Sequence, residues 1–311
     1  MEPILQIEHL SITFTQYSRG ARRRELPVIR NLSLSLSPGE VTAVVGASGS
    51  GKSLLAHAIL GLLPYNSRRE GSILYKGQEL TPRRLEKLRG REISLVPQGV
   101  TYLDPLMKVG PQLTQGRRDI DTRRRAQEAL SRYGLGPGTE RLYPFQLSGG
   151  MARRVLMASA VMESPQLIIA DEPTPGLDAQ AAGRLLGHFR ELAQEGAAVL
   201  FITHDLELAL TVAHRVAVFY AGETIEEALA SDFEAGSLRH PFTQALWDAL
   251  PQQGFRPIPG SQPYPGEVGE GCPFLGQCPH PGADCAQGPL PLRPFQGGAV
   301  RCLYPNKEVA P

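Results

Sequence analysis

An eight-residue stretch, GASGSGKS at positions 46–53, constrains the fold of this chain more than any other feature. It follows VTAVV (41–45), a continuous apolar run of the kind found in buried parallel strands. It opens a helical pattern that runs from 52 to 63 and stops before Pro64. A strand that leads through a glycine-rich loop into a helix is a building unit of α/β proteins with a parallel sheet.

The glycine-rich loop matches the pattern G-x-x-x-x-G-K-[ST], with Gly46, Gly51, Lys52 and Ser53 at the fixed positions. Its glycines let backbone N–H groups surround an anion, and the helix N-terminus adds partial positive charge. Lys52 can reach the outer phosphates of a nucleotide, and the Ser53 hydroxyl can ligate magnesium. A turn without a ligand is the alternative, but the flanking strand and helix favour a phosphate site. The residues expected around the phosphates are Gly46, Ala47, Ser48, Gly49, Ser50, Gly51, Lys52, Ser53 and Leu54.

A pair of acids ends a second apolar run, LIIADEP at 167–173. Asp171 can hold magnesium through water at the end of a buried strand, and Glu172 can orient or deprotonate an attacking water. Two acids can simply end a strand, but a phosphate loop in the same chain favours the catalytic interpretation.

Apolar runs alternate with helical patterns along the chain, which predicts a parallel sheet covered by helices. Strands are expected at 4–14, 28–36, 71–75, 93–96, 167–171, 198–203 and 215–220, and helices at 178–195 and 205–213. Helical spacing dominates residues 100–164, which predicts an inserted helical subdomain. Residues 251–311 are rich in Pro and Gly and predict a small appended domain or tail.

The bulk composition excludes several classes of protein. The 311 residues carry a net charge of +1, which gives no electrostatic case for nucleic acid as the main partner. No apolar run approaches the roughly 20 residues of a membrane helix, and the N-terminus MEPILQIEHL lacks the layout of a signal peptide. We therefore expect a soluble, cytoplasmic protein that reaches a membrane only through a partner.

Three further motifs follow in a fixed order: Gln98 after the strand ISLVP, LSGGM at 147–151, and His204 after AVLFIT. With the phosphate loop, LIIADEP and GLD at 176–178, the chain resembles an ATP-binding-cassette (ABC) ATPase over residues 1–225. The resemblance implies a P-loop NTPase core of α/β class with an antiparallel β subdomain and an inserted helical subdomain, followed by a C-terminal extension at 226–311. It also implies ATP and Mg²⁺ as cofactors.

The resemblance also implies roles for single residues. Phe14 would stack on adenine, with Tyr17 as a second choice, and Asp178 would belong to a loop that links two nucleotide sites. Glu172, Gln98 and His204 would act in catalysis, with Gln98 at magnesium and the attacking water and His204 at the γ-phosphate. The signature residues that would bind the γ-phosphate held by the opposite subunit are Ser148, Gly149 and Gly150. The magnesium ligands would be Ser53, Gln98 and Asp171.

Two positions depart from the usual family pattern. Met151 ends the signature where Gln is usual, and Pro175 stands where Ser is usual. Because Pro175 has no backbone N–H to donate, contacts made by its loop are expected to differ. Neither change removes a group with a direct catalytic role.

Other segments are similar to the ATPase subunits of the peptide and nickel importers. These are YPFQLSGGM with the arginine-rich ARRVLMA after it, RHPFTQALWDALP at 239–251, and the cysteine tail. The resemblance implies a second, unlike ATPase subunit, two transmembrane permeases and an extracytoplasmic substrate-binding protein. It places the chain at the cytoplasmic face of the inner or plasma membrane, bound through the permeases, with peptides, nickel or a metal–chelator complex as cargo.

All four cysteines lie in the tail, at Cys272, Cys278, Cys285 and Cys302. Clustered thiols in a reducing cytosol suggest a metal site rather than disulfides. The tight C-x-x-C pairs of structural zinc are absent, and an iron–sulfur cluster tolerates looser spacing. A [4Fe–4S] cluster, Zn²⁺ and unligated cysteines are the three alternatives.

Two other functions compete with the importer. A soluble ABC protein acting on nucleic acid or ribosomes usually has two cassettes or long coiled-coil inserts, and this chain has neither. An accessory ABC ATPase of an enzyme complex, of the phosphonate-breakdown or cluster-assembly type, is the alternative that remains. Co-purification with membrane permeases distinguishes it from an importer subunit.

Overall fold

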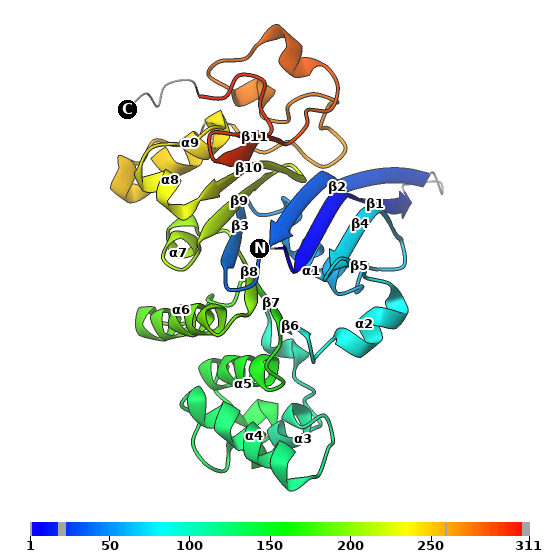
Figure 1. Cartoon of the computed structure of the whole chain (residues 1–311), viewed down its shortest axis with the longest axis vertical. Coiled ribbons are helices and arrows are strands. Elements are labelled where there is room, and N and C mark those ends of the chain that lie inside the picture. Colours follow the sequence, from blue (N-terminus) through cyan, green and yellow to red (C-terminus); the bar gives the residue numbers. More distant parts are fainter. Residues whose placement is uncertain (1, 18–22, 259, 307–311) are drawn as a thin grey trace.

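The computed structural model describes residues 2–17, 23–258 and 260–306. The helical subdomain lies at one end of the long axis and the cysteine-containing extension at the other, with the sheets between them (Figure 1). No helix in this described part of the chain is both long and apolar enough to span a bilayer.

The central sheet runs through the middle of the molecule. Its strands are β3 (Val41–Gly46), β6 (Ile93–Val96), β7 (Leu167–Asp171), β8 (Ala198–Thr203), β9 (Arg215–Tyr220), β10 (Glu223–Leu229), β11 (Arg293–Phe295) and β12 (Gly298–Val300). Their order is β11-β12-β10-β9-β3-β8-β7-β6. The neighbours from β9 to β6 are parallel, and those from β9 to β11 are antiparallel. The predicted parallel α/β core is confirmed.

The three inner strands β3, β7 and β8 are buried along their whole length. A parallel strand covered on both faces needs apolar residues on both sides, which explains the continuous apolar runs. In the parallel register Val45 lies beside Thr203 and Val96 beside Ala170, so the carboxyl ends of these strands meet at one edge. That edge carries the motif residues.

A second, antiparallel sheet packs beside the core (Figure 1). It is formed by β1 (Leu5–Tyr17), β2 (Arg23–Leu36), β4 (Ser67–Tyr75) and β5 (Gln78–Glu79), in the order β2-β1-β4-β5. Its inward side chains share one apolar cluster with Val44 and with α1 (Lys52–Ile59). The predicted half-exposed strands are confirmed and are a few residues longer than expected.

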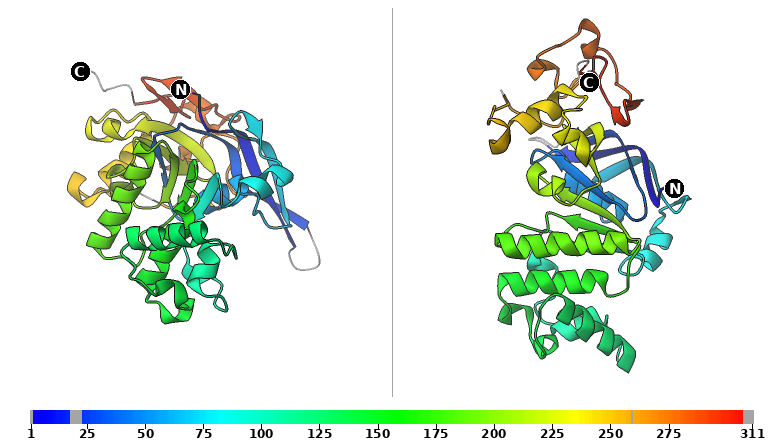
Figure 2. Two further views of the ribbon diagram at one scale, coloured as in Figure 1. Left: turned by 60° about the horizontal axis from the view of Figure 1, so that its bottom comes forward. Right: turned by 60° about the vertical axis from the view of Figure 1, so that its left-hand side comes forward.

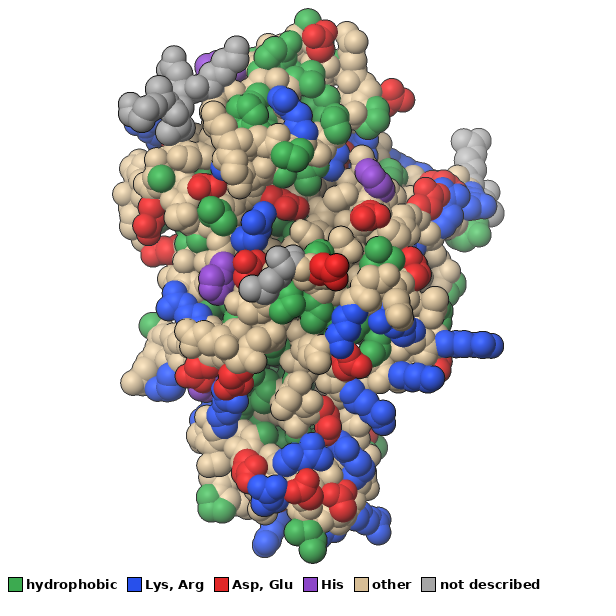
Figure 3. Space-filling view, viewed as in Figure 1, with side chains coloured by type: hydrophobic (Ala, Val, Ile, Leu, Met, Phe, Trp, Pro, Cys, Tyr) green, Lys and Arg blue, Asp and Glu red, His purple; other side chains and the backbone are tan. Residues whose placement is uncertain are grey.

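The inserted segment, residues 100–161, consists of helices joined by turns and contains no strand, and the structure describes all of it. Its elements are η1 (Val100–Tyr102), α3 (Val109–Leu113), α4 (Ile120–Arg132), η2 (Thr139–Arg141), η3 (Pro144–Gln146) and α5 (Gly149–Val161). Asp119 caps α4 by accepting a hydrogen bond from the Thr122 N–H at 2.8 Å. Acidic and basic side chains alternate over this end of the surface, which is the appearance of a solvated face (Figure 3).

The remaining helices lie beside the two sheets or within the extension. They are α2 (Pro82–Leu88), α6 (Ala179–Gln194), α7 (Leu206–Leu210), α8 (Ala230–Glu234), α9 (Pro241–Asp248), η4 (Pro251–Gln253), η5 (Leu275–Gln277) and η6 (Ala283–Ala286). In two views α5 and α6 lie one above the other on the same side of the core (Figure 1, Figure 2). A larger apolar cluster joins both helices to the second face of the central sheet.

The extension continues the central sheet, which the sequence did not predict. Strand β12 pairs with β10, with Val300 opposite Glu226, and β11 forms the edge. Glu226 is fully buried and pairs with Arg239, with Oε1 and Nη1 3.4 Å apart. Removing one partner of this buried ion pair would leave an uncompensated charge beside the docked extension.

Candidate active site

The phosphate loop joins the carboxyl end of β3 to the N-terminus of α1. At Gly46 the chain runs so close to β9 that a Cβ atom would lie 2.3 Å from the carbonyl oxygen of Phe219. Gly51 caps α1 with φ 98°, a left-handed conformation that glycine adopts without strain. The backbone path therefore requires both glycines, and it leaves Ala47, Ser48 and Gly49 exposed to a ligand.

Lys52 is buried inside this loop. Its Nζ donates hydrogen bonds to the carbonyl oxygens of Gly46 at 2.7 Å and Ala47 at 2.9 Å. Burial lowers the pKa of Lys52, and the nearby carboxylates of Glu172 and Asp171 oppose that change. The ammonium group is thus held at the centre of the loop, beside Asp171 at the end of β7 and Glu172 directly after it.

Ser53 and Asp171 form the second part of the site. The Ser53 hydroxyl donates to Oδ1 of Asp171 at 3.0 Å, although the two residues are 118 positions apart. Burial raises the pKa of Asp171, and the Ser53 hydrogen bond acts against this. Hydroxyl and carboxylate oxygens are the donors that magnesium prefers, so this pair fits the expected ion.

Glu172 lies between two further motif residues. Its Oε1 is 3.0 Å from Nδ1 of His204, and its Oε2 accepts a hydrogen bond from Nε2 of Gln98 at 3.4 Å. Its backbone is left-handed, with φ 44°, which costs a non-glycine residue about 1–3 kcal/mol. The Glu172 N–H donates to the carbonyl oxygen of Ile202 at 2.9 Å, which holds this conformation. The structure thus gathers the residues predicted from three separate motifs.

Arg153 also belongs to this site, and the sequence analysis missed it. Its guanidinium donates to the carbonyl oxygens of Gln98 and Pro173, each at 2.9 Å. It therefore connects the segments that carry Gln98 and Glu172. The only signal was the arginine-rich start of α5, which identified no partner for any one arginine.

The signature and Asp178 lie at the starts of two helices. Ser148 caps α5 by accepting from the Met151 N–H at 3.2 Å, and Asp178 caps α6 by accepting from Ala181 at 2.7 Å. Neither side chain makes a hydrogen bond to the phosphate loop within the described residues. Ser148, Gly149 and Asp178 are exposed, so they are open to a second molecule. Met151 packs against the larger apolar cluster and Pro175 is exposed.

Comparisons with known proteins agree with this geometry. The family described as "ABC transporter" matches residues 29–175, which contain the phosphate loop, Gln98, the signature and both acids. The oligopeptide transport ATP-binding protein OppD of Escherichia coli is 34% identical, over 99% of this chain and 95% of its own length. The chain belongs to the ABC transporter family. A second family, "Oligopeptide/dipeptide transporter, C-terminal region", matches residues 225–285 of this ABC protein.

Other relatives support the same fold and enzyme class. The dipeptide transport ATP-binding protein DppD of Bacillus subtilis is 35% identical over 90% of this chain and 88% of its own length. The ATP-binding cassette MJ0796, solved as a dimer bound to ADP and Pi, matches with a TM-score of 0.63. That match is 27% identical and covers 73% of this chain and 98% of MJ0796. The ABC ATPase fold is confirmed, and the class is that of ATP-hydrolysing transport ATPases.

The proposed adenine contacts lie on β1 of the ABC protein. Phe14 is half-buried and packs against the cluster that contains α1. Tyr17, at the end of β1, is 73% exposed. The adenine role of Phe14 remains a prediction. Tyr17 is exposed and so remains the second candidate for stacking on adenine.

The four cysteines converge on one small cavity, which they line together with His240 and His280. Burial raises the pKa of Cys272 and of Cys302 to about 11, and neighbouring thiols add to this effect. Within the described residues, no three His, Cys, Asp or Glu side chains form a site for one metal ion. The thiols thus surround a common space without closing around a single point.

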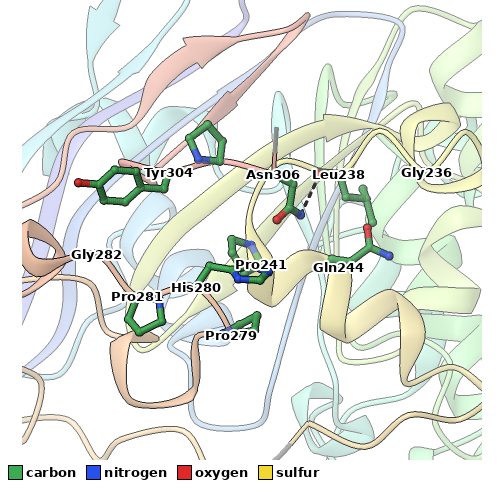
Figure 4. Close-up of a pocket in the computed structure, with 11 residues that line it drawn as sticks. Gly236, Leu238, Pro241, Gln244, Pro279, His280, Pro281, Gly282, Tyr304 and Asn306 are labelled. Atoms are coloured by element: carbon green, nitrogen blue, oxygen red, sulfur yellow. Dashed lines mark hydrogen bonds between the residues drawn. The ribbon is translucent and has the colours of Figure 1, made fainter. Parts of the chain in front are cut away.

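Two further cavities border the extension. One of about 350 Å³ is lined by the phosphate loop and His204 on one side and by Ile258, Gln262 and Gln277 on the other. The extension therefore forms a wall beside the nucleotide site, which the sequence did not predict. A second, of about 850 Å³, lies between α9 and residues 279–282 and 304–306 (Figure 4). Its lining residues His280 and Tyr304 also border the cysteine cavity.

Proposed function

We propose that this chain is the ATP-hydrolysing subunit of an importer for peptides. The observation that carries the proposal is the convergence of Lys52, Ser53, Asp171, Glu172 and His204 on one loop, in a chain whose extension matches the oligopeptide/dipeptide transporter family. The relatives are named as oligopeptide and dipeptide transport proteins, which supports peptides as cargo. They do not favour an accessory ATPase of an enzyme complex.

We assign a separate function to each of three segments of the chain. Residues 1–225 bind and hydrolyse ATP, the helical subdomain at about 100–164 transmits motion, and residues 226–311 form the extension. Residues 46–54 hold the phosphates of ATP, and Phe14 stacks on the adenine. Lys52 exchanges its two carbonyl contacts for phosphate oxygens.

Hydrolysis depends mainly on positioning and on charge stabilisation. Ser53, Asp171 and Gln98 would hold Mg²⁺, which supplies positive charge at the β- and γ-phosphates. Glu172 orients the attacking water and accepts its proton. His204 donates to the γ-phosphate through the ring nitrogen that does not face Glu172.

The exposed signature supplies the other half of a composite site. Ser148, Gly149 and Gly150 would bind the γ-phosphate of ATP held by a second, unlike ATPase subunit, and Asp178 would link the two sites. ATP binding closes this pair of subunits, and hydrolysis followed by product release reopens it. Two permeases, which receive cargo from an extracytoplasmic binding protein, would hold the pair at the cytoplasmic face of the membrane.

A [4Fe–4S] cluster at Cys272, Cys278, Cys285 and Cys302 is proposed as a further cofactor. Four thiols line one cavity, as the donor set of a cluster requires. His240 lines the same cavity, and its fully buried Nε2 atom has no hydrogen-bond partner in the part of the chain that the structure describes. The cysteines lack the C-x-x-C pairs of structural zinc sites, and their looser spacing favours the cluster over Zn²⁺. The cluster would order a segment rich in Pro and Gly.

Co-expression with the permeases of a peptide importer tests the proposed function. The chain should co-purify with the permeases, and their reconstituted assembly should hydrolyse ATP faster when the binding protein carries a peptide. Uptake of Ni²⁺ or a nickel chelate in place of peptides would contradict the assignment of peptides as cargo but would still support an importer. An active ATPase that retains no membrane partner would contradict the proposal and favour the accessory role.

A further inference from the structure

A cavity of about 480 Å³ lies between α4, α5 and α6. None of its lining residues belongs to the phosphate loop, although Arg153, Gly150 and Asp178 of the site described above lie along its wall. The two longer walls come from α5 and α6, which lie one above the other (Figure 1, Figure 2). A volume of this size accommodates a small organic ligand.

The lining of this cavity is strongly basic. Four arginines contribute to it: Arg132, Arg153, Arg154 and Arg184. Asp178 is the one carboxylate in the lining, and it already accepts the helix-capping hydrogen bond from Ala181. The cationic charge of the walls therefore exceeds the anionic charge by several units.

Most of this positive charge has no counter-charge in the described chain. Arg132 pairs with Glu191 and Glu195, each at 3.3 Å. For the other three arginines, no carboxylate of residues 2–17, 23–258 or 260–306 lies within ion-pair distance. Among the residues that the structure describes, Arg153 and Arg154 donate only to backbone carbonyl oxygens, which do not neutralise a guanidinium. Burial lowers the pKa of Arg153, as expected for a cation without a paired acid.

Two neutral polar groups of the lining are also unsatisfied. The hydroxyl of Tyr133 has no hydrogen-bond partner in the described structure, although the residue is only 5% exposed. The Nδ1 atom of His188 is likewise buried without a partner, and the two rings meet edge-on at 4.8 Å. Buried polar groups normally find a partner in protein, water or ligand, because leaving one unpaired costs about 1–3 kcal/mol.

We propose that this cavity is a second ligand site, for a small phosphate-bearing molecule. The guanidinium fork of arginine matches phosphate oxygens in pairs, and a tyrosine hydroxyl supplies a further donor. Gly150 and Asp178 also line the cavity, so an occupant would contact both the signature helix and the start of α6. If the proposed function holds, this ligand would lie beside the two segments that face the second ATPase subunit.

The test uses the full chain with Lys52→Ala, which weakens anion binding at the phosphate loop. Inorganic pyrophosphate is titrated without magnesium, and binding is followed by calorimetry. We expect binding to persist, to weaken at least tenfold when Arg184→Gln is added, and to weaken severalfold with Tyr133→Phe. Arg184 is exposed, so its loss should not disturb folding. Arg83→Gln, at an exposed arginine of α2, is the matched control and should have no effect.

Two results would overturn the proposal. One is loss of all pyrophosphate binding in the Lys52→Ala protein. The other is an affinity that Arg184→Gln and Tyr133→Phe both leave unchanged. Arg184→Lys should restore part of the affinity, which separates a charge effect from a folding defect. Failure of ATP turnover would contradict the proposed ATPase function but would not change pyrophosphate binding. The ATPase proposal and the ligand-site proposal can therefore be refuted independently.

Discussion

Nδ1 of His204 lies 3.0 Å from Oε1 of Glu172. The Glu172 side chain is 14% exposed and the His204 side chain 55%, so the imidazole is the more accessible of the two. A carboxylate that engages one ring nitrogen fixes the ring and leaves the other nitrogen free for a ligand. This arrangement suits a carboxylate that acts on water and an imidazole that contacts a phosphate.

Replacing His204 with Ala should slow ATP turnover about 100-fold, because a preorganised donor to the γ-phosphate is lost. ATP affinity should change little, since the phosphate loop remains intact. The measurement is steady-state phosphate release together with nucleotide binding. His9→Asn, at an exposed histidine of β1, is the control and should leave the rate unchanged. Equal rates for His204→Ala and the original chain would rule out the role assigned to His204.

Replacing Asp171 with Asn should raise the magnesium concentration needed for hydrolysis by about tenfold or more, because a charged oxygen is lost from the site. Protons compete with magnesium for this carboxylate. Since burial raises the pKa of Asp171, apparent magnesium affinity should fall as the pH is lowered toward that raised pKa.

Magnesium titrations at a near-neutral pH and at a lower, acidic pH check both points. The original chain should show the pH dependence and Asp171→Asn should lack it. A magnesium requirement that is the same in both proteins at both pH values would exclude Asp171 from the ion site.

Replacing Arg239 with Met should destabilise the extension by about 3–5 kcal/mol. Arg239 pairs with Glu226 and Asp232 and donates to the carbonyl oxygens of Phe295 and Gln296. Its loss leaves Glu226 buried without its cation. Urea unfolding and proteolysis of the extension measure the effect.

The matched control is Arg256→Gln, at an exposed arginine that follows η4, which should be neutral. Adding Glu226→Gln to Arg239→Met should recover part of the lost stability, because the uncompensated charge is then gone. If Arg239→Met unfolds at the same urea concentration as the original chain, this ion pair does not hold the extension in place.

Anaerobic purification tests the cysteine site. About four irons and four acid-labile sulfides per chain are expected for a cluster. Cys285→Ser should remove both, because that thiol is buried in the common cavity. Zinc in place of iron, or neither metal, would exclude the cluster and leave the ATPase assignment unchanged.

Elements whose sequence carries a clear local pattern could be predicted from the sequence. The apolar runs of β3, β7 and β8 and the loop that ends in Lys52 and Ser53 each carry their own signal. The meeting of Ser53 and Asp171 followed from the magnesium role that each motif predicts and not from local pattern, since 118 residues separate the two.

What the sequence did not predict depends on contacts between distant segments. Glu226 lies in an acidic stretch that looks solvent-exposed, yet it is buried in β10 between β9 and β12 and pairs with Arg239. Arg301 donates to the carbonyl oxygen of Asn31 across 270 residues, which no local pattern reveals. Arg153 was missed for the same reason, because both of its partners are backbone carbonyl groups.

ATP turnover by Glu172→Gln tests the central claim most directly. The variant is compared with the original chain in the assembly co-purified with its permeases, with bound nucleotide measured in parallel. Since Gln keeps the shape of Glu172 but cannot accept a proton, we predict normal ATP binding and a loss of sustained turnover. Multiple turnovers by Glu172→Gln at the rate of the original chain would contradict the catalytic site described here.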